Sequence, residues 1–309
     1  MHEIFVNLKR FDVPKDMGGI CLQSDPQKWI EDIIADTVKF GLGKLEDVNI
    51  TYILAEGLIL SANNKLKEFE SSDTENINIG IQGVFRDDVS PGGNFGAFSA
   101  NRPATAMKNL GCTWTMNGHS EERLDKFTMF SLFDSNVQSD PKLLKKANDT
   151  VSLLLNKENI SALKQGLDVL FCVGETAEER GGGSFDEQKP RIEAVLRDQL
   201  LIGLKDVKPY LEERKIVIGY EPRWAIGPGK VPPGAEYISF VSDFIKETTN
   251  EMLGVELPVV YGGGLKEENA KMIAGIETID GGLVALTKFT GDIAFEPEGL
   301  KTIIETYLS

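Results

Sequence analysis

A single carboxylate stands where an apolar segment ends in the stretch Ile218–Lys230. Glu221 follows the strand-like run Ile218–Tyr220, and the chain then turns at Pro222. Gly, Ala and Pro recur in the residues that follow, as they do in segments that open and close over a site. A carboxylate fixed at a strand end below such a flap suits a general base that works where water is excluded.

Histidine is scarce in this chain, which makes His119 the main candidate for proton or hydrogen-bond chemistry. The other histidine, His2, lies beside the first residue. Ser120 is a good N-cap and acidic residues follow it, so we expect a helix to start there. The positive potential at a helix N-terminus would keep the His119 ring neutral, and a neutral ring can donate a hydrogen bond at neutral pH.

An amide and a lysine end the first apolar run of the sequence. Side chains alternate between the two faces of a strand, so Asn7 and Lys9 share one face while Leu8 points to the other. Together, the amide and the ammonium group would hold a substrate oxygen and offset its negative charge. Taken alone, Asn-x-Lys is a weak signal and more often describes a solvated lysine at a strand edge.

Short apolar runs alternate with longer amphipathic segments along the whole chain. The predicted strands are 3–8, 49–54, 77–81, 112–117, 168–173, 215–220, 257–261 and 280–285. Apolar residues recur at helical spacing in Asp25–Phe40, Pro190–Leu204 and Ala235–Leu253. This alternation predicts an α/β fold with a parallel sheet, and eight such units predict a (β/α)₈ barrel.

A doubly wound open sheet is the competing fold. It is not supported, because the first predicted strand is not followed by Gly-x-Gly-x-x-Gly. Glycine-rich strand ends at 262–264 and 281–282 favour the barrel. Two stretches are predicted insertions, 10–24 after the first strand and 126–165 between the fourth and fifth. No Pro/Gly/Ser-rich linker divides the chain, so we expect 1–309 to form one domain.

Composition excludes several classes of partner. The net charge of −15 disfavours a nucleic-acid or anionic-membrane partner, and no apolar run is long enough to span a bilayer. The N-terminal residues lack the pattern of a signal peptide. Three scattered cysteines are too few for a disulfide framework or a zinc site, which favours a cytoplasmic protein without a bound metal.

Taken in order, the motifs resemble those of the triose-phosphate isomerase family across nearly the whole chain. The landmarks are Asn7-x-Lys9, Gly96-Ala97-Phe98-Ser99, Gly118-His119-Ser120-Glu121, Cys172-x-Gly174-Glu175, Tyr220-Glu221-Pro222-x-Trp224-Ala225-Ile226-Gly227 and Tyr261-Gly262-Gly263. The resemblance implies a TIM barrel that interconverts an aldose phosphate and a ketose phosphate through an enediol. It further implies no cofactor or metal, a homodimer, and a role in glycolysis and gluconeogenesis.

The resemblance also implies a role for each matching residue. Glu221 would move a proton between adjacent carbons, and neutral His119 would donate to the substrate oxygens. Lys9, beside Asn7, would offset the charge of the enediolate, with Glu121 as a supporting acidic neighbour. Residues 222–232 would form the lid, which includes Pro222, Arg223, Trp224, Ala225, Ile226, Gly229 and Lys230.

Departures from the family pattern concentrate where the substrate phosphate would bind. The implied phosphate-binding residues are Gly227, Gly263, Gly264, Ala285 and Leu286. Gly264 replaces the usual serine, and Ala285 and Leu286 replace a pair of glycines. Lys288 is a candidate compensating cation, although a solvated lysine is an equal alternative.

The lid and the predicted dimer loop depart from the family as well. Arg223 replaces a small apolar residue in the lid, where it would meet an anionic substrate or form a surface ion pair, and Pro232 stiffens the far end. Ala100–Pro103 replaces the Gly-Glu pair expected after Ser99. These changes leave the geometry of a dimer open.

The leading hypothesis is an isomerase of dihydroxyacetone phosphate and glyceraldehyde 3-phosphate. Its main rival is an isomerase of a four-carbon ketose phosphate such as an erythrulose phosphate, suggested by the altered phosphate end. A barrel that binds a metabolite without catalysis is less favoured, because it has no use for a base, a hydrogen-bond donor and a cation at one point. A metal-dependent aldolase or isomerase is disfavoured by the single usable histidine.

Overall fold

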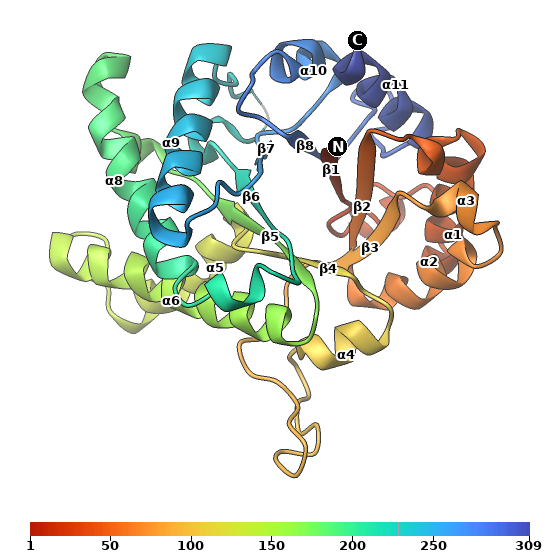
Figure 1. Ribbon diagram of the computed structural model, residues 1–309, viewed down its shortest axis with the longest axis horizontal. Coiled ribbons are helices and arrows are strands. Elements are labelled where there is room, and N and C mark those ends of the chain that lie inside the picture. Colours follow the sequence, from red (N-terminus) through yellow and green to blue (C-terminus); the bar gives the residue numbers. More distant parts are fainter. Residues whose placement is uncertain (228) are drawn as a thin grey trace.

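Eight parallel strands close into a barrel in the computed structural model, which describes residues 1–227 and 229–309 (Figure 1). Each strand pairs with the next one in sequence, and β8 pairs with β1 to close the ring. The strands are β1 His2–Asn7, β2 Val48–Leu54, β3 Ile77–Ile81, β4 Trp114–Asn117, β5 Asp168–Val173, β6 Ile216–Tyr220, β7 Val259–Tyr261 and β8 Gly281–Val284. The predicted (β/α)₈ barrel is confirmed.

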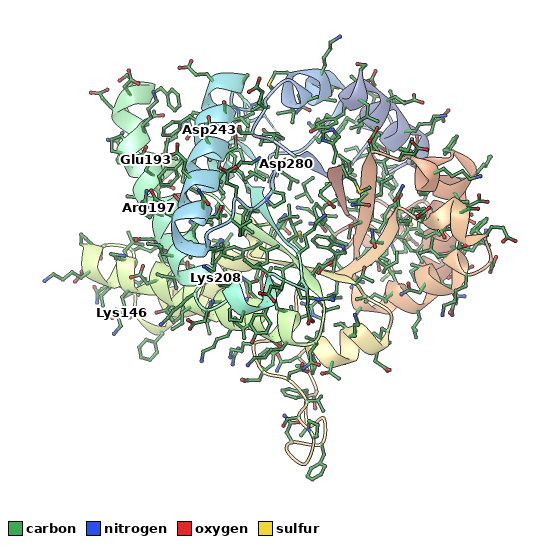
Figure 2. All side chains as sticks on the ribbon, in the orientation of Figure 1. Lys146, Glu193, Arg197, Lys208, Asp243 and Asp280 are labelled. Atoms are coloured by element: carbon green, nitrogen blue, oxygen red, sulfur yellow. The ribbon has the colours of Figure 1, made fainter. Side chains whose placement is uncertain are left out.

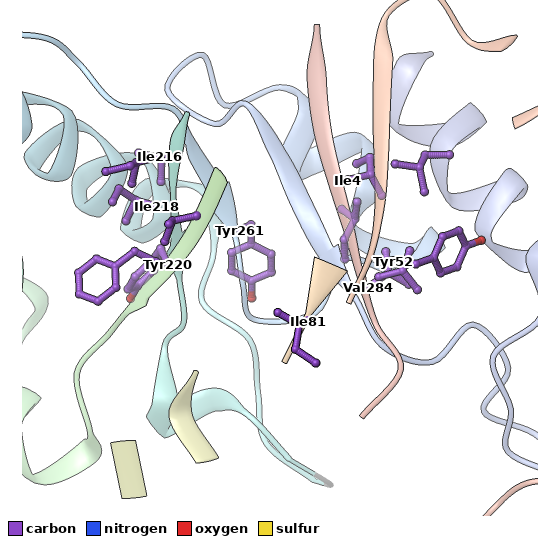
Figure 3. Close-up of a cluster of buried hydrophobic side chains, with 14 of the residues drawn as sticks. Ile4, Tyr52, Ile81, Ile216, Ile218, Tyr220, Tyr261 and Val284 are labelled. Atoms are coloured by element: carbon purple, nitrogen blue, oxygen red, sulfur yellow. The ribbon is translucent and has the colours of Figure 1, made fainter. Parts of the chain in front are cut away.

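Two shells of apolar side chains sandwich the barrel wall. Alternate residues of the strands point inward and fill the barrel with side chains such as Phe5, Trp114 and Leu170. The other residues point outward and pack below the helices, as Ile218 and Tyr261 do (Figure 3). Because both faces of each strand are buried, the strands read in the sequence as continuous apolar runs.

Helices cover the outside of the barrel. They are α1 Pro26–Lys39, α2 Ile59–Leu66, α3 Ser71–Thr74, α4 Ala104–Asn109, α5 Ser120–Phe133, α6 Pro141–Lys164, α7 Ala177–Arg180, α8 Phe185–Gly203, α9 Ala235–Leu253, α10 Glu267–Ala274 and α11 Pro297–Leu308. Charged side chains such as Lys146, Glu193 and Arg197 lie along the outer surfaces of α6 and α8 (Figure 2). No helix among the described residues is long and apolar enough to cross a membrane.

Helix α8 begins five residues before the predicted start at Pro190. The side chain of Glu187 accepts hydrogen bonds from the backbone N–H and the hydroxyl of Ser184, and this caps the first turn. Pro190 cannot donate a backbone hydrogen bond inside the helix. The cap at Ser184 offsets part of the stability that is lost with that bond. The predicted bounds of the first and third amphipathic segments agree with α1 and α9 to within one residue at each end.

The two predicted insertions have different structures. Residues 10–24 contain one short 3₁₀ helix, Lys15–Met17, and are otherwise irregular. Residues 126–165 span most of α5, a connection and the long helix α6, as their two helical patterns predict. The segment between β3 and α4 extends away from the barrel as an arm (Figure 1).

Candidate active site

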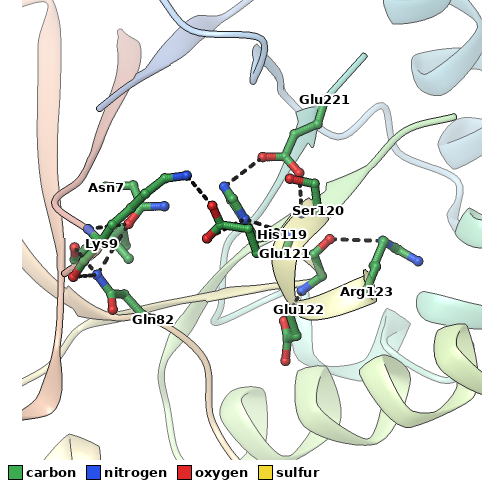
Figure 4. A network of polar contacts seen from close by, with 11 residues as sticks. Asn7, Lys9, Gln82, His119, Ser120, Glu121, Glu122, Arg123 and Glu221 are labelled. Carbon is green, nitrogen blue, oxygen red and sulfur yellow. Dashed lines mark hydrogen bonds and ion pairs between the residues drawn. The ribbon is translucent and has the colours of Figure 1, made fainter. Parts of the chain in front are cut away.

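The predicted base, ring and cation meet at the end of the barrel where the strands finish. Lys9 follows β1, His119 follows β4, and Glu221 follows β6 (Figure 4). The carboxyl ends of parallel barrel strands share one rim, so residues more than a hundred positions apart converge there.

Glu221 is buried, with 1% of its surface exposed, and its carboxylate contacts the start of α5. Its Oε1 lies 3.2 Å from Nε2 of His119, and its Oε2 accepts a hydrogen bond of 2.7 Å from the backbone N–H of Ser120. Burial raises the pKa of Glu221 above the ordinary glutamate value, while His119 and the Ser120 N–H partly offset that rise. A carboxylate with a raised pKa is a better proton acceptor than an exposed one.

His119 itself is the N-cap of α5, so the prediction that Ser120 caps this helix was wrong. Ser120 is the first helical residue, and Nδ1 of His119 accepts a hydrogen bond of 3.3 Å from the backbone N–H of Glu121. An imidazole nitrogen can replace a serine oxygen here because it, too, has a lone pair that points at the free N–H groups. Since Nδ1 accepts, the ring proton is on Nε2, which faces Glu221.

Lys9 is held in an uncommon backbone conformation, with φ of 42°. Its backbone N–H donates to Oδ1 of Asn7 over 3.0 Å, and its ammonium group lies 2.6 Å from Oε1 of Glu121. Burial raises the pKa of Glu121, but the hydrogen bond and charge of Lys9 outweigh it and hold that pKa below its usual value. Glu121 therefore stays ionised beside Lys9 and fixes the direction of the lysine side chain.

Two residues that the sequence patterns did not single out support this arrangement. Nε2 of Gln82, directly after β3, donates to the carbonyl oxygen of Lys9 over 2.8 Å. Arg123 donates to the carbonyl oxygens of Gly118 (2.9 Å) and Cys172 (2.8 Å), which ties the ends of β4 and β5 together. A polar residue directly after a strand was the available signal for Gln82.

The predicted lid begins with a short 3₁₀ helix, Arg223–Ala225, which is anchored on a buried carboxylate. Glu175 accepts hydrogen bonds from Nε1 of Trp224 (2.7 Å) and from the hydroxyls of Tyr237 (2.7 Å) and Tyr220 (3.1 Å). Burial raises the pKa of Glu175, and the three donors counter the rise. These hydrogen bonds fix the first turn of the predicted lid, Arg223–Ala225, against Glu175.

The rest of the predicted lid is mixed in exposure. Pro222 and Ala225 are buried, Ile226 is half-buried, and Gly227, Gly229 and Lys230 are exposed. Within the predicted range 222–232, Pro228 lies outside the described residues. Pro232 follows on the exposed far side.

Glycine is required at position 174, where two backbones meet. A Cβ at Gly174 would lie 1.7 Å from the carbonyl oxygen of Glu221, which real atoms do not tolerate. The backbone N–H of Glu221 also donates to the carbonyl oxygen of Val173, over 2.8 Å. The base is thus positioned by the end of β5.

The predicted phosphate-binding residues lie after β6, β7 and β8. Gly227 and Gly264 have φ of 117° and 97°, values that glycine adopts without strain. Ala285 and Leu286 follow β8 directly and are half-buried. Lys288 lies 2.9 Å from Glu296 in a surface ion pair, so the solvated alternative is the one observed.

Arg223 and Cys172 have different surroundings from the catalytic candidates. Among the described residues, no carboxylate lies within ion-pair distance of Arg223, so the surface ion pair proposed for it is not observed; the side chain instead lines a cavity beside α5 and α8. Cys172 is fully buried inside the barrel, and burial raises the pKa of its thiol well above the ordinary value. That thiol is therefore a core group rather than a nucleophile.

Residues 42–296 match the family model described as triosephosphate isomerase. The chain belongs to this family. The triosephosphate isomerase of Chloroherpeton thalassium is 32% identical over 219 residues, which are 70% of this chain and 73% of that relative. The triosephosphate isomerase of Francisella tularensis subsp. mediasiatica is 32% identical over 224 residues, 71% of this chain and 73% of the relative.

A solved structure supports the fold of this family member. The triosephosphate isomerase from Bartonella henselae superposes with a TM-score of 0.67, covering 100% of this chain and 99% of the other. The two sequences are 20% identical, so this likeness concerns the barrel alone.

Replacing Trp224 by phenylalanine should loosen the start of the lid. The variant removes one of three donors to the buried Glu175 carboxylate, and hydrogen bonds to charged groups contribute about 1.5–3 kcal/mol. We expect faster amide hydrogen exchange in residues 223–227, measured by mass spectrometry. Trp29→Phe on α1 is the control, and equal exchange in the two variants would contradict the role of this contact.

Proposed function

We propose that this chain is a triosephosphate isomerase, which interconverts dihydroxyacetone phosphate and glyceraldehyde 3-phosphate through an enediol. The observation that carries the proposal is the convergence of Glu221, His119 and Lys9 at one end of the barrel, with the base 1% exposed. A buried base, a neutral donor and a cation are the groups that proton transfer beside a carbonyl requires. Family membership supplies the substrate, a small sugar phosphate.

In the proposed reaction, Glu221 acts on carbon and His119 acts on oxygen. The Glu221 carboxylate takes a proton from the carbon beside the substrate carbonyl, and the electron pair of that C–H bond moves into the enediolate. The Nε2–H of His119 donates to the substrate oxygens, while the ammonium group of Lys9 offsets their negative charge. Nε2 of His119 passes the hydroxyl proton from one substrate oxygen to the other, Glu221 returns its proton to the neighbouring carbon, and the enzyme ends unchanged.

Substrate must replace the contacts that hold these groups in the free protein. The Glu221 carboxylate is held by Ser120 and His119, and the Lys9 ammonium group by Glu121. The side chains of Glu221 and Lys9 are therefore already oriented by partners at the barrel rim, so they lose little further conformational freedom when substrate binds. The lid would then exclude water from the enediolate.

At the phosphate end, backbone N–H groups are the proposed ligands. Gly227 on the lid, Gly263 and Gly264 after β7, and Ala285 and Leu286 after β8 would present their N–H groups to the phosphate oxygens. Backbone donors do not depend on side-chain identity, so the replacement of a serine and two glycines is compatible with phosphate binding. The net charge of −15 likewise does not prevent it.

The two alternatives from the sequence are less favoured. The relatives from Chloroherpeton thalassium and Francisella tularensis are triosephosphate isomerases, so family membership does not favour a four-carbon ketose phosphate as the substrate. A barrel that binds without catalysing does not explain why a base, a donor and a cation meet at one point.

Glu221→Asp is the direct test of the proposed base. The shorter side chain withdraws the carboxylate by about 1 Å, and misplacement of that size lowers catalysis roughly 10²-fold or more. We expect kcat on dihydroxyacetone phosphate, measured in a coupled assay with purified protein, to fall by about 10²–10³ without a change in thermal unfolding. Glu256→Asp, at an exposed glutamate, should keep full activity. Absence of turnover of dihydroxyacetone phosphate by a folded wild-type protein would contradict the proposal.

The pH dependence of kcat/KM should report the raised pKa of Glu221. The base works only when ionised, so kcat/KM falls as pH drops through the pKa of this group in the free enzyme. Because burial raises that pKa, the acidic limb should lie above the ordinary glutamate value of about 4.3. Glu221→Asp should move the limb; a limb that stays in place belongs to the substrate phosphate and would contradict the assignment.

A second copy of the chain is the proposed protein partner, in one homodimer located in the cytoplasm. The arm between β3 and α4 projects from the barrel (Figure 1), and its residue Phe95 is 91% exposed. An exposed aromatic side chain on a projecting segment suits insertion into a partner.

We also propose that residues 1–309 form one catalytic domain, since the barrel strands run from one end of the chain to the other. The three cysteines are free and buried, which fits a reducing compartment.

Phe95→Asp should convert the proposed dimer to a monomer, because a carboxylate in a packed interface is strongly unfavourable. Phe133 is equally exposed, at 91%, but lies at the end of α5, so Phe133→Asp is a matched control. Sedimentation velocity of the three proteins measures the effect. A monomeric wild type, or a dimer that persists in Phe95→Asp, would contradict this proposal.

A further inference from the structure

A cavity of about 640 Å³ lies outside the barrel, between the helices that follow β4 and β5. Its walls come from α5, α6, α7 and α8, and α5, α6 and α8 lie side by side in Figure 1. None of Asn7, Lys9, His119 and Glu221 lines it. The volume is in the range of sites that bind small molecules, which is about 300–1,000 Å³.

Two arginines, Arg123 and Arg223, line this cavity. Arg123 is 4% exposed, and its Nε and Nη2 atoms donate to carbonyl oxygens, while Nη1 makes no hydrogen bond to the described residues. Arg223 lines the same cavity, and no carboxylate of the described residues lies within 4.0 Å of either guanidinium group. Burial and the nearby charge of Arg223 lower the pKa of Arg123 to about 10.

Arg123 is buried and Arg223 is half-buried, and two adjacent cations without a carboxylate partner repel each other. A bound anion would relieve that repulsion and the cost of burying Arg123. The pair therefore favours an anionic group that contacts both guanidinium groups. A guanidinium group recognises a carboxylate through two parallel hydrogen bonds, so a carboxylate suits the pair.

The walls restrict the rest of the ligand. Apolar side chains line part of the cavity, namely Leu124, Phe127, Leu144, Val151 and Val195. Lys145, which is paired with Asp149 and Asp198, also lines the cavity, together with Glu178 and Glu179. These carboxylates repel a multiply charged anion more strongly than a monoanion, so a monoanion with an apolar body suits the lining best.

We propose that this cavity binds a small aliphatic monocarboxylate, with its carboxylate between Arg123 and Arg223 and its chain along the apolar wall. The site is separate from the proposed isomerase site, and its binding test does not require activity. Arg223 belongs to the first turn of the lid, and Arg123 holds the strand ends beside His119. Occupancy would therefore stabilise the lid start in the position that the structure shows.

Isothermal titration calorimetry with sodium octanoate tests the site. We expect one octanoate per chain, at least tenfold weaker binding in Arg223→Gln, and no measurable binding in Leu144→Trp, which fills the cavity. Arg197→Gln is the matched control, since Arg197 lies on the outside of α8 paired with Glu251 and does not line the cavity. Thermal unfolding of each variant verifies that it is folded.

Two further ligands separate charge from apolar contact. Octanol lacks the charge and acetate lacks the chain, so each should bind at least tenfold more weakly than octanoate. Equal binding of octanol would overturn the role of the arginines, and equal binding of acetate would overturn the role of the apolar wall. Absence of octanoate binding to the wild type, or unchanged affinity in Arg223→Gln, would overturn the proposal as a whole.

Discussion

The contact between the Glu221 carboxylate and the first turn of α5 is the interaction on which the catalytic end depends. A charged carboxylate that is 1% exposed is stable only with partners, and Ser120 and His119 provide them. That requirement fixes the start of α5 relative to the end of β6, although the two are a hundred residues apart in sequence. Arg123 supports this contact by donating hydrogen bonds to carbonyl oxygens at the ends of β4 and β5.

Much of the barrel could be predicted from the sequence. Strands that are buried on both faces consist of short apolar runs, and each predicted run corresponds to one observed strand. The convergence of Lys9, His119 and Glu221 followed from the rule that strand ends share a rim. The error at Ser120 arose from residue preferences at helix starts, which rank serine highly and cannot register that an imidazole nitrogen already occupies the capping position.

Other features depend on contacts between distant segments, and local patterns alone do not establish those contacts. Gln82 supports Lys9 from another strand, and only the closed barrel brings the two together. Lys288 was a candidate phosphate ligand until the fold placed Glu296 beside it. Arg223 departs from the family pattern, and its sequence position did not reveal that it faces the helices rather than the barrel opening. Direction is a tertiary property for long, flexible side chains.

The backbone contact at Gly174 has a consequence for how this protein can change over evolutionary time. The main chain carrying the base rests directly on the main chain of the neighbouring strand, with no side chain between them. Substitutions in the outer apolar shell that leave both strands in place therefore leave the backbone of Glu221 in place as well. Such an arrangement lets most of the sequence drift, including both insertions and the phosphate end, while the position of one carboxylate stays constant. An identity of 32% to a relative is then compatible with a fixed position for the Glu221 carboxylate.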